Sequence, residues 1–576
     1  MINVIFKLYE LCDLKKSKLF LFVFFSIIVT FFEVLSLSII YPMVKVMLGE
    51  TDVDYISNFP FIEHLNEYPL IIIFSLLLIF VFVTKNLITY LIRVWLAKFS
   101  WTSLVFLRKR VVNKYTEMDY EDFLDKGVVY INSAINEYTR IIIQGMESSL
   151  KLFGEVLILI LITSYLFFLN IKLTSILLFF VSIISFFYYL LTFKKVISQG
   201  KDNQDGEKKL YSSSFFLFRG IKEIKILKKD NYLIDKLISG AKKISDANIS
   251  NQKIKLIPRY LLEAVFIVFG CIFIIFAAKT NYESSEILSL ISVYAFAALR
   301  LLPSVSQIGI CINDINYALS PTNLIYEDVV EKAKKIKTNS NISGNLKLAR
   351  FKSLELNNIS FKYKNSDKKV LDKLSIKIVK DDFIGIIGPS GVGKSTLIDI
   401  LLGYLKPSEG EVNLIDQKDN HIETNQVMSY LAQEPIIIQG SISENIRLSE
   451  NENNVDVSKI TEAIKFAELE NFVKNLKNGN KTILGEGGIN LSIGQKQRLA
   501  LARCFYSERE IMILDEPSSA LDEKTQDNIF NNLNFLKGKK TIILITHNHR
   551  TLKFCNKIFK FDDKTLKPFN LNEKTK

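Results

Sequence analysis

Six long apolar stretches, separated by polar segments, lie within the first 330 residues of the chain. A helix needs roughly 20 apolar residues to cross the ~30 Å hydrocarbon core of a membrane, and each stretch is about that long. They cover residues 20–41, 70–94, 152–169, 173–193, 257–278 and 287–312. Only 170–172 separate the third stretch from the fourth, which predicts a tight helical hairpin. The pattern therefore predicts an all-α domain over 1–330 with six membrane-spanning helices.

The pattern changes after a polar segment rich in Lys, Asn and Ser, which we interpret as a linker over 331–350. Beyond the linker, short apolar runs typical of buried strands are followed by helical segments. This alternation predicts a separate α/β domain over 351–576. We therefore expect a multi-domain protein, with a helical transmembrane domain followed by an α/β domain.

Composition excludes one class of partner. The chain carries a net charge of +13, and 49% of its 576 residues are hydrophobic. A nucleic-acid-binding protein can be as basic as this, but it does not carry long apolar runs. We therefore expect no nucleic-acid partner. The five cysteines are far apart and show no metal-binding or disulfide spacing.

The basic residues gather on one side of the predicted membrane domain. Segment 194–259 has sixteen Lys and Arg against seven Asp and Glu, whereas 49–69 has five acidic residues and no basic ones. Because basic loops stay on the cytoplasmic side, both termini, two long helical loops and the α/β domain are predicted to be cytoplasmic. Within those loops, the segments around 120–130 and 220–229 are candidates for docking on a cytoplasmic domain.

A glycine-rich motif follows the apolar run 383–387 and opens a predicted helix. It consists of Gly388, Pro389, Ser390, Gly391, Val392, Gly393, Lys394, Ser395 and Thr396. In a P-loop of this pattern, glycines let backbone N–H groups turn toward phosphates, and the helix N-terminus favours their negative charge. Lys394 suits the β- and γ-phosphates, and the Ser395 hydroxyl suits Mg²⁺. The motif predicts that the chain binds ATP and Mg²⁺.

Two consecutive carboxylates, Asp515 and Glu516, end the apolar run 511–514. The carboxyl ends of parallel strands meet at one edge of a sheet, so both are expected beside the P-loop. Asp515 suits Mg²⁺, directly or through water, and Glu516 suits polarising the attacking water as a general base. An apolar run that ends in Asp-Glu is common by itself, and the preceding P-loop favours the catalytic interpretation.

Between these motifs stands the sequence Leu491-Ser492-Ile493-Gly494-Gln495. With it, the whole chain resembles the ATP-binding cassette (ABC) transporters, specifically exporter half-transporters with six spans and one nucleotide-binding domain. The resemblance implies that His547 is the switch histidine near the γ-phosphate. The other residues that it implies contact the nucleotide or its metal are Tyr363 (adenine stacking), Gln433 (Mg²⁺), Ser492, Gly494, Gln495 (signature motif) and Asp522 (D-loop).

The signature motif departs from the family pattern, which is usually Leu-Ser-Gly-Gly-Gln, because Ile493 occupies its third position. Ser492 and Gly494 are retained, and so are Glu516 and His547, so an inactive site is not expected. In the family this motif contacts the γ-phosphate bound to the opposite subunit. The resemblance therefore implies a dimer with nucleotide sandwiched between subunits. Two intact sites favour a homodimer, and a heterodimer stays open.

A narrower resemblance concerns the membrane half, which is similar to the lipid-linked oligosaccharide flippases. It rests on Phe32-Glu33 with Pro42, on 220–227, on 258–260 with Glu263, and on 300–304. This resemblance implies a polyprenyl-pyrophosphate-linked glycan that is moved from the inner to the outer leaflet of a bacterial inner membrane. An anion that crosses an apolar barrier needs fixed cations, and the candidate substrate ligands are Arg93, Arg259 and Arg300.

Each arginine also has a structural interpretation. Arg93 and Arg259 stand near cytoplasmic span ends, where they can snorkel to lipid headgroups, and Arg300 can pair with Glu33. Two alternatives to a glycolipid flippase therefore stay open. One is a general exporter of lipid, peptide or drug, and the other is a non-transport role in which the ATPase acts as a switch.

Overall fold

The computed structural model describes residues 2–14, 16–48, 70–278, 284–331, 350–364, 366–449, 456–485 and 488–570. The chain divides into two compact units. The first contains Met1–Met118 and Asp122–Ser340, and the second contains Asp119–Glu121 and Asn341–Lys576. Apart from its two end residues, the predicted linker over 331–350 lies outside the described residues.

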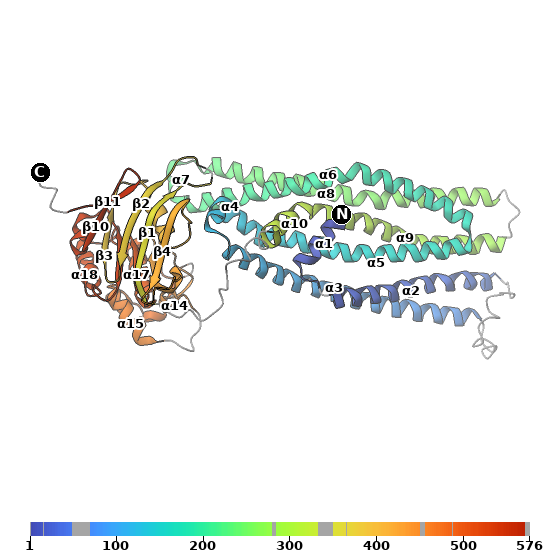
Figure 1. Cartoon of the computed structure of the whole chain (residues 1–576). Helices are drawn as coiled ribbons and strands as arrows, with labels where there is room; N and C mark the ends of the chain where they lie inside the picture. Colours follow the sequence, from blue (N-terminus) through green and yellow to red (C-terminus); the bar gives the residue numbers. More distant parts are fainter. Residues whose placement is uncertain are drawn as a thin grey trace. The chain divides into compact units, whose positions relative to one another are not determined.

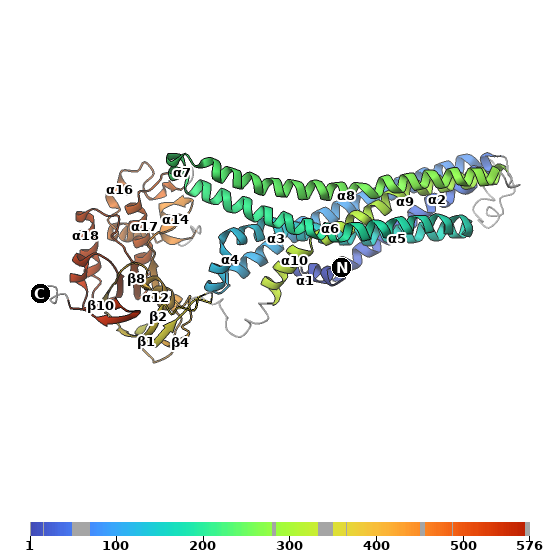
Figure 2. The same ribbon diagram turned by 90° about the horizontal axis from the view of Figure 1, so that it is seen from above.

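The first unit is entirely helical in its described part, and its long helices run lengthwise beside one another (Figures 1 and 2). Its elements are α1 (Ile2–Leu11), α2 (Lys16–Met47), α3 (Leu70–Thr116), α4 (Tyr120–Ser133), η2 (Ala134–Tyr138), α5 (Thr139–Leu169), α6 (Ile171–Arg219), α7 (Ile221–Leu227), α8 (Asp230–Ala278), α9 (Ser284–Tyr317), α10 (Leu319–Tyr326) and η3 (Glu327–Glu331).

Within the described residues, five helical segments are long and apolar enough to cross a membrane. They are Lys16–Met47, Ile71–Thr116, Tyr120–Leu169, Ile171–Arg219 and Ile287–Glu331. These segments contain five of the six predicted spans. The remaining one, 257–278, is helical within α8 but is not among the five, and side chains 273 and 276–278 lie outside the described residues.

The predicted hairpin between the third and fourth spans is confirmed, because α5 ends at Leu169 and α6 begins at Ile171. Asn170, in an extended conformation, stands between them, and its side chain accepts a hydrogen bond from Leu173 N at 3.1 Å. This N-cap satisfies one of the backbone donors that a helix start leaves free. A single polar residue therefore ends one helix and starts the next.

Two apolar clusters hold together the first unit, which we call the membrane unit. One packs α1 against α3, α5, the end of α9, α10 and η3. It includes Leu8, Leu107, Ile142 and Ile315. The other joins α2, α5 and α9. Many other apolar side chains on these helices are exposed, as expected for helices whose outer faces meet lipid rather than water.

The second unit contains a six-stranded sheet, a three-stranded antiparallel sheet and a short two-stranded pair. The strands are β1 (Phe351–Phe361), β2 (Leu371–Val379), β3 (Phe383–Ile387), β4 (Glu409–Asp416), β5 (Met428–Leu431), β6 (Gly440–Ser441), β7 (Ile483–Leu484), β8 (Ile511–Asp515), β9 (Thr541–Ile545), β10 (Lys557–Asp562) and β11 (Thr565–Pro568). The helices are α12 (Lys394–Leu401), α13 (Thr424–Val427), α14 (Ile442–Arg447), α15 (Val457–Phe466), α16 (Glu470–Lys474), η5 (Gly479–Lys481), α17 (Ile493–Tyr506), α18 (Glu523–Asn534) and η6 (His549–Phe554).

The six-stranded sheet has the order β11-β10-β3-β9-β8-β5, and only β11 pairs antiparallel. Two of its inner strands are continuously buried: β3 and β9 are buried at all five positions. This is the pattern of a parallel strand covered on both faces. One apolar core packs α12 and the three-stranded sheet against the six-stranded sheet. A second apolar core packs α14, α15, α17 and α18 against the six-stranded sheet. The predicted fold class, transmembrane helices followed by an α/β domain, is confirmed.

Candidate functional site

The neighbouring parallel strands β3, β9 and β8 bring three sequence segments to one edge of the sheet. Asp515 pairs with Ile545 in the register of β8 and β9, and Ile386 pairs with Ile545 in that of β3 and β9. Consequently the glycine-rich loop after β3, the carboxylates that end β8, and His547 after β9 all leave the sheet at its carboxyl edge. Open parallel sheets bind ligands at this edge.

The loop between β3 and α12 needs glycine for its backbone. Gly391 has φ +79° and Gly393 has φ +113°, a region that L side chains rarely adopt. At Gly393 an added Cβ would also lie 3.1 Å from Val370 Cγ1. The loop leads directly into α12, whose first turn has no side-chain cap. Its backbone donors are therefore available to phosphate oxygens, as the P-loop motif predicts.

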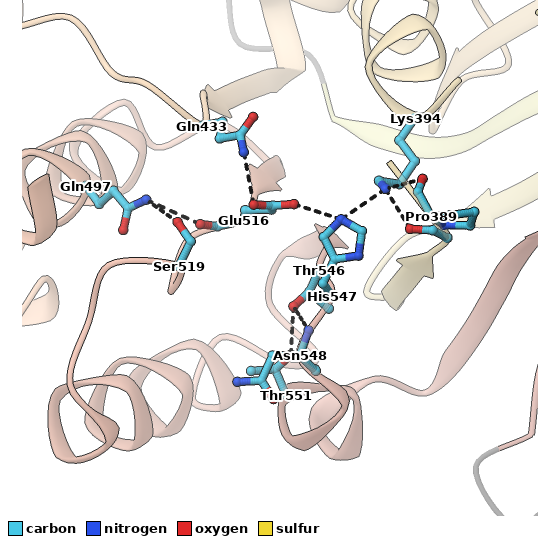
Figure 3. Close-up of polar contacts among 11 residues, drawn as sticks. Pro389, Lys394, Gln433, Gln497, Glu516, Ser519, Thr546, His547, Asn548 and Thr551 are labelled. Atoms are coloured by element: carbon cyan, nitrogen blue, oxygen red, sulfur yellow. Dashed lines mark hydrogen bonds and ion pairs between the residues drawn. The ribbon is translucent and has the colours of Figure 1, made fainter. Parts of the chain in front are cut away.

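Lys394 lies between the glycine-rich loop and His547 (Figure 3). Its Nζ donates to the carbonyl oxygens of Gly388 at 2.7 Å and Pro389 at 2.9 Å, and lies 3.2 Å from His547 Nε2. Burial lowers the pKa of this amine, while the negative charges of Glu516 and Asp515 oppose the shift. The contacts hold the ammonium group between the glycine-rich loop and the end of β9.

Glu516 contacts two of the predicted functional residues. Its Oε2 accepts a hydrogen bond from Gln433 Nε2 at 3.0 Å, and its Oε1 lies 3.1 Å from His547 Nε2 (Figure 3). The residue has φ +50°, in the left-handed region, and its N–H donates to Ile545 O at 2.9 Å. The tautomer of His547 decides whether Nε2 donates to Glu516 or accepts from Lys394.

The neighbouring carboxylate, Asp515, is half-buried at the end of β8. Burial raises its pKa to about 6, and the charge of Glu516 adds to the shift, while Lys394 opposes it. A cation beside Asp515 would stabilise its ionised form. The Ser395 hydroxyl, the Gln433 amide oxygen and the Asp515 carboxylate are hard oxygen donors of the kind that Mg²⁺ prefers. This donor set fits the predicted metal.

The signature motif begins α17. Ser492 is its N-cap: Ser492 Oγ accepts from Gln495 N at 3.2 Å, and Gln495 Oε1 accepts from Ser492 N at 2.9 Å. At Gly494 an added Cβ would lie 2.7 Å from Ala520 O, so only glycine fits there. Ile493 is 68% exposed. Among the described residues, no hydrogen bond joins this motif to Lys394, Asp515 or Glu516.

Two other predicted nucleotide contacts have local partners. The Tyr363 hydroxyl lies 3.1 Å from Thr396 Oγ1, which ties the predicted adenine-stacking residue to the first turn of α12. Asp522 caps α18 by accepting from Thr525 N at 3.0 Å. The structure therefore places Tyr363 beside the P-loop and places Asp522 at a helix start.

Sequence reasoning missed Gln497, which is almost fully buried. Its Nε2 donates to Ser519 Oγ at 2.8 Å and, at 3.5 Å, to the backbone oxygen of Glu516 (Figure 3). It thereby connects α17 to the segment after β8. The sequence carries no signal for these contacts, because a polar residue two positions after Gln495 on a helix is equally compatible with solvent and with a buried partner.

The three candidate substrate arginines in the membrane unit do not share one environment. Arg93 and Arg300 both line a cavity of about 260 Å³. Arg259 is exposed on α8 and is not among the residues lining that cavity. Arg300 forms an ion pair with Glu33, the alternative considered from the sequence. The structure thus brings two of the three arginines to one cavity.

The chain is similar to known proteins in sequence and in fold. Residues 371–519 match the family model described as ABC transporter. The chain is 30% identical over 309 residues to ABC transporter B family member 29, chloroplastic, of Arabidopsis thaliana, covering 52% of this chain and 47% of that protein. It is 28% identical over 468 residues to the pediocin PA-1 transport/processing ATP-binding protein PedD of Pediococcus acidilactici, covering 79% and 62%.

The fold resembles the solved structure of a bacterial Atm1-family ABC exporter with ATP bound. The TM-score is 0.70 at 17% identity, and the similarity covers 96% of this chain and 95% of that one. The chain spans about half to three fifths of the length of the first two curated relatives, 47% of the Arabidopsis protein and 62% of a probable ABC transporter ATP-binding/permease protein of Haemophilus influenzae.

Proposed function

We propose that this chain is one subunit of an exporter that hydrolyses ATP to move a substrate across a membrane. The observation that carries the proposal is the cluster of Lys394, His547, Glu516 and Gln433 at the carboxyl edge of the parallel sheet. The family match over 371–519, the fold and the five apolar helices support it.

In this proposal the glycine-rich loop and Lys394 bind the phosphates of ATP. Lys394 exchanges its bonds to the Gly388 and Pro389 carbonyl oxygens for phosphate oxygens, which are stronger acceptors because they are charged. Ser395, Gln433 and Asp515 would hold Mg²⁺, which supplies positive charge to neutralise the phosphates. The residues from Gly388 to Thr396 surround the phosphates, and Tyr363 stacks on the adenine.

Glu516 is the proposed general base, and His547 orients it. A carboxylate at the end of β8 polarises the attacking water, while the contact at 3.1 Å with His547 and the hydrogen bond at 3.0 Å from Gln433 restrict where its oxygens point. His547 also contacts Lys394, which supports a role for His547 near the terminal phosphate. Orientation of this kind is the main source of catalysis in phosphoryl transfer.

We further propose that two copies of the chain form the complete enzyme. Ser492, Gly494 and Gln495 begin α17 with no hydrogen bond to Lys394 or Glu516 among the described residues, and Asp522 caps α18. These residues would contact the nucleotide bound to a second copy. The proposed location is a bacterial inner membrane, with the ATP-hydrolysing unit in the cytoplasm.

The narrower proposal is that the substrate is a polyprenyl-pyrophosphate-linked oligosaccharide that moves from the inner to the outer leaflet. Arg93 and Arg300 support it, because both line the membrane cavity and guanidinium groups bind phosphate through two parallel hydrogen bonds. Arg259 would act from outside this cavity. Export of a lipid, peptide or drug by the same ATPase is the alternative.

The ATP chemistry is tested by replacing Glu516 with glutamine in the purified full chain. We expect Glu516→Gln to retain ATP binding and to lower ATP turnover by about 10²-fold or more, because the general base is lost. Lys394→Ala should weaken nucleotide binding itself. ATP binding and phosphate release, measured on both variants, separate the two roles. Wild-type hydrolysis by Glu516→Gln would refute the general-base assignment.

The substrate proposal is tested by reconstituting the wild-type chain and measuring ATPase stimulation by lipid-linked glycans, phospholipids and cationic drugs. Stimulation by lipid-linked glycans supports the flippase. Stimulation by cationic drugs alone would favour the general exporter, because a cationic substrate does not need an arginine-lined cavity.

A further inference from the structure

Three charged side chains from different helices meet inside the membrane unit. Glu33 of α2 is only 2% exposed. Its Oε2 lies 2.8 Å from Lys85 Nζ of α3, and its Oε1 contacts Arg300 Nε of α9. We call these three residues the charge cluster. Sequence alone suggested the Arg300 pairing but not that Lys85 shares the same carboxylate.

The charge cluster is unbalanced, with two cations against one carboxylate. The surplus positive charge is open to an added anion, because the Arg300 side chain is 30% exposed whereas the Glu33 side chain is 3% exposed. Two of its charged atoms, Glu33 Oε2 and Arg300 Nε, are also buried without a hydrogen bond of acceptable geometry. The ion pairs therefore do not saturate the cluster. One further negative charge would allow two balanced pairs.

Arg300 makes the charge cluster accessible, because it also lines the 260 Å³ cavity. The two carboxylates that line this cavity already have partners: Glu147 pairs with Lys151 at 2.6 Å, and Glu155 accepts from Ser304 Oγ at 2.6 Å. Ser304 is neutral, so Glu155 keeps its charge, but Arg93 also lines the cavity and the lining stays cationic, with Arg93, Lys151 and Arg300 against Glu147 and Glu155. An anion that enters the cavity would meet an arginine whose counter-charge is shared with Lys85.

We propose that Glu33 is the counter-anion of Arg300 in the absence of substrate, and that an anionic group of the transported substrate replaces Glu33 as the partner of Arg300. In the absence of substrate, Glu33 is shared between Lys85 and Arg300. When the anion binds Arg300, Glu33 stays with Lys85, and two balanced ion pairs replace one unbalanced cluster. This inference rests on the proposed function, and it assigns Glu33 and Lys85 as positioning residues that set the affinity for anions.

The exchange predicts changes of opposite sign for two neutral substitutions. Glu33→Gln removes the competing carboxylate, so anions should bind more tightly. Lys85→Gln leaves Glu33 entirely to Arg300 in a balanced pair, so anions should bind more weakly. The double variant has one free arginine and the same net charge as the wild type, and should respond at concentrations close to those of the wild type. A purely structural tie between helices predicts that both single variants only lose activity.

The test uses the full chain in phosphatidylcholine nanodiscs, with ATPase activity measured against undecaprenyl pyrophosphate and against undecaprenol. The two lipids share a hydrocarbon chain and differ in the anionic group. We expect half-maximal stimulation at about tenfold lower pyrophosphate-lipid concentration in Glu33→Gln and about tenfold higher in Lys85→Gln. Glu137→Gln is the matched control: Glu137 pairs with Arg140 and does not line the cavity, so the concentration for half-maximal stimulation should change by less than about twofold.

The outcomes separate this inference from the proposed function. If wild type responds to the pyrophosphate lipid but the two single variants shift in the same direction or not at all, the exchange is overturned and the flippase stands. If wild type hydrolyses ATP but responds equally to both lipids, the anionic substrate and the exchange both fail. If Glu33→Gln does not fold, because two buried cations lose their partner, Lys85→Gln and the double variant still decide the matter.

Discussion

At the scale of single residues, the proposed chemistry depends on a few charged groups that lie close together at the carboxyl edge of the sheet. Lys394, Asp515 and Glu516 influence one another's charge, and burial shifts the pKa of Lys394 down and that of Asp515 up. Both shifts favour the neutral forms. Bound phosphates and a metal ion would reverse this preference, because they bring counter-charges for both groups. Ligand binding would therefore favour the charged forms of Lys394 and Asp515 at this edge of the sheet.

Asp399 of α12 lowers the stability of the folded chain at neutral pH. Burial and the charge of Asp515 raise its pKa from 3.8 to about 6. The unfolded chain releases this proton near pH 4 and the folded chain near pH 6, so the carboxylate destabilises the fold as the pH rises through that window.

We predict that Asp399→Asn stabilises the full chain at pH 7.5 and that the gain shrinks toward pH 4.5. Solvent screens the half-buried group, so we expect about 1 kcal/mol, or about 2–4 °C in the thermal midpoint. Thermal unfolding without nucleotide or Mg²⁺ measures it. An equal gain at both pH values would show that the titration of Asp399 is not the cause.

Ile493 permits a second residue-scale prediction. It is 68% exposed in the first turn of α17, so Ile493→Gly removes little buried surface and costs at most about 1 kcal/mol of helix propensity. Ser492 and Gly494 remain in place. We expect ATP turnover to stay unchanged or to rise in a steady-state phosphate-release assay. A tenfold loss would show that this chain depends on the isoleucine.

At the scale of elements, a buried polar network joins three helices of the membrane unit. Asp328 of η3 accepts from Lys126 Nζ of α4 at 2.7 Å, from Tyr115 OH of α3 at 3.0 Å and from Tyr130 OH of α4 at 3.1 Å. Asp328 is 3% exposed. Because three donors converge on one carboxylate, the end of the last helix is held against the end of α3 and against α4.

We predict that Asp328→Asn destabilises this unit by about 3 kcal/mol, because Lys126 loses its buried counter-charge. Hydrogen exchange of η3 should accelerate as its tie to α3 and α4 weakens. The control is Asp205→Asn, which breaks an exposed pair with Lys243 at 3.1 Å and should cost less than about 1 kcal/mol. Equal effects of the two substitutions would contradict the proposed role of the network.

At the scale of the whole molecule, the proposed dimer makes each ATP site a composite of two chains. Glu516 and Lys394 would come from one copy, and Ser492 from the other. A defect in Glu516 and a defect in Ser492 therefore fall on the same site when they are carried by different chains.

We predict that the Glu516→Gln and Ser492→Arg chains are each inactive alone, but that a mixed dimer recovers about half of the wild-type ATPase activity. One composite site then carries both defects, and the other carries none. Dimers purified through two different affinity tags test this. Inactivity of the mixed dimer would show that both sites must work together, and activity of either pure dimer would contradict the composite site.

The sequence alone determined the features that depend on local pattern. Apolar stretches of membrane-spanning length indicated the helices, and the three residues 170–172 between two of them indicated the hairpin. The glycine-rich loop before a helix predicted the phosphate site. Each signal is local, because helix length, capping and a backbone with positive φ depend on residues close together in the chain.

The tertiary structure alone decided which distant residues share a partner. Glu33 is shared by Lys85 and Arg300 because α2, α3 and α9 pack together, and Gln497 reaches Glu516 because α17 packs beside β8. Neither contact has a sequence signature, since a single polar residue on a helix is equally compatible with solvent, lipid headgroups or a buried partner. Which of these environments a residue meets depends on how helices and strands that are far apart in the sequence pack together. That packing therefore also decides which charges lie together in each site.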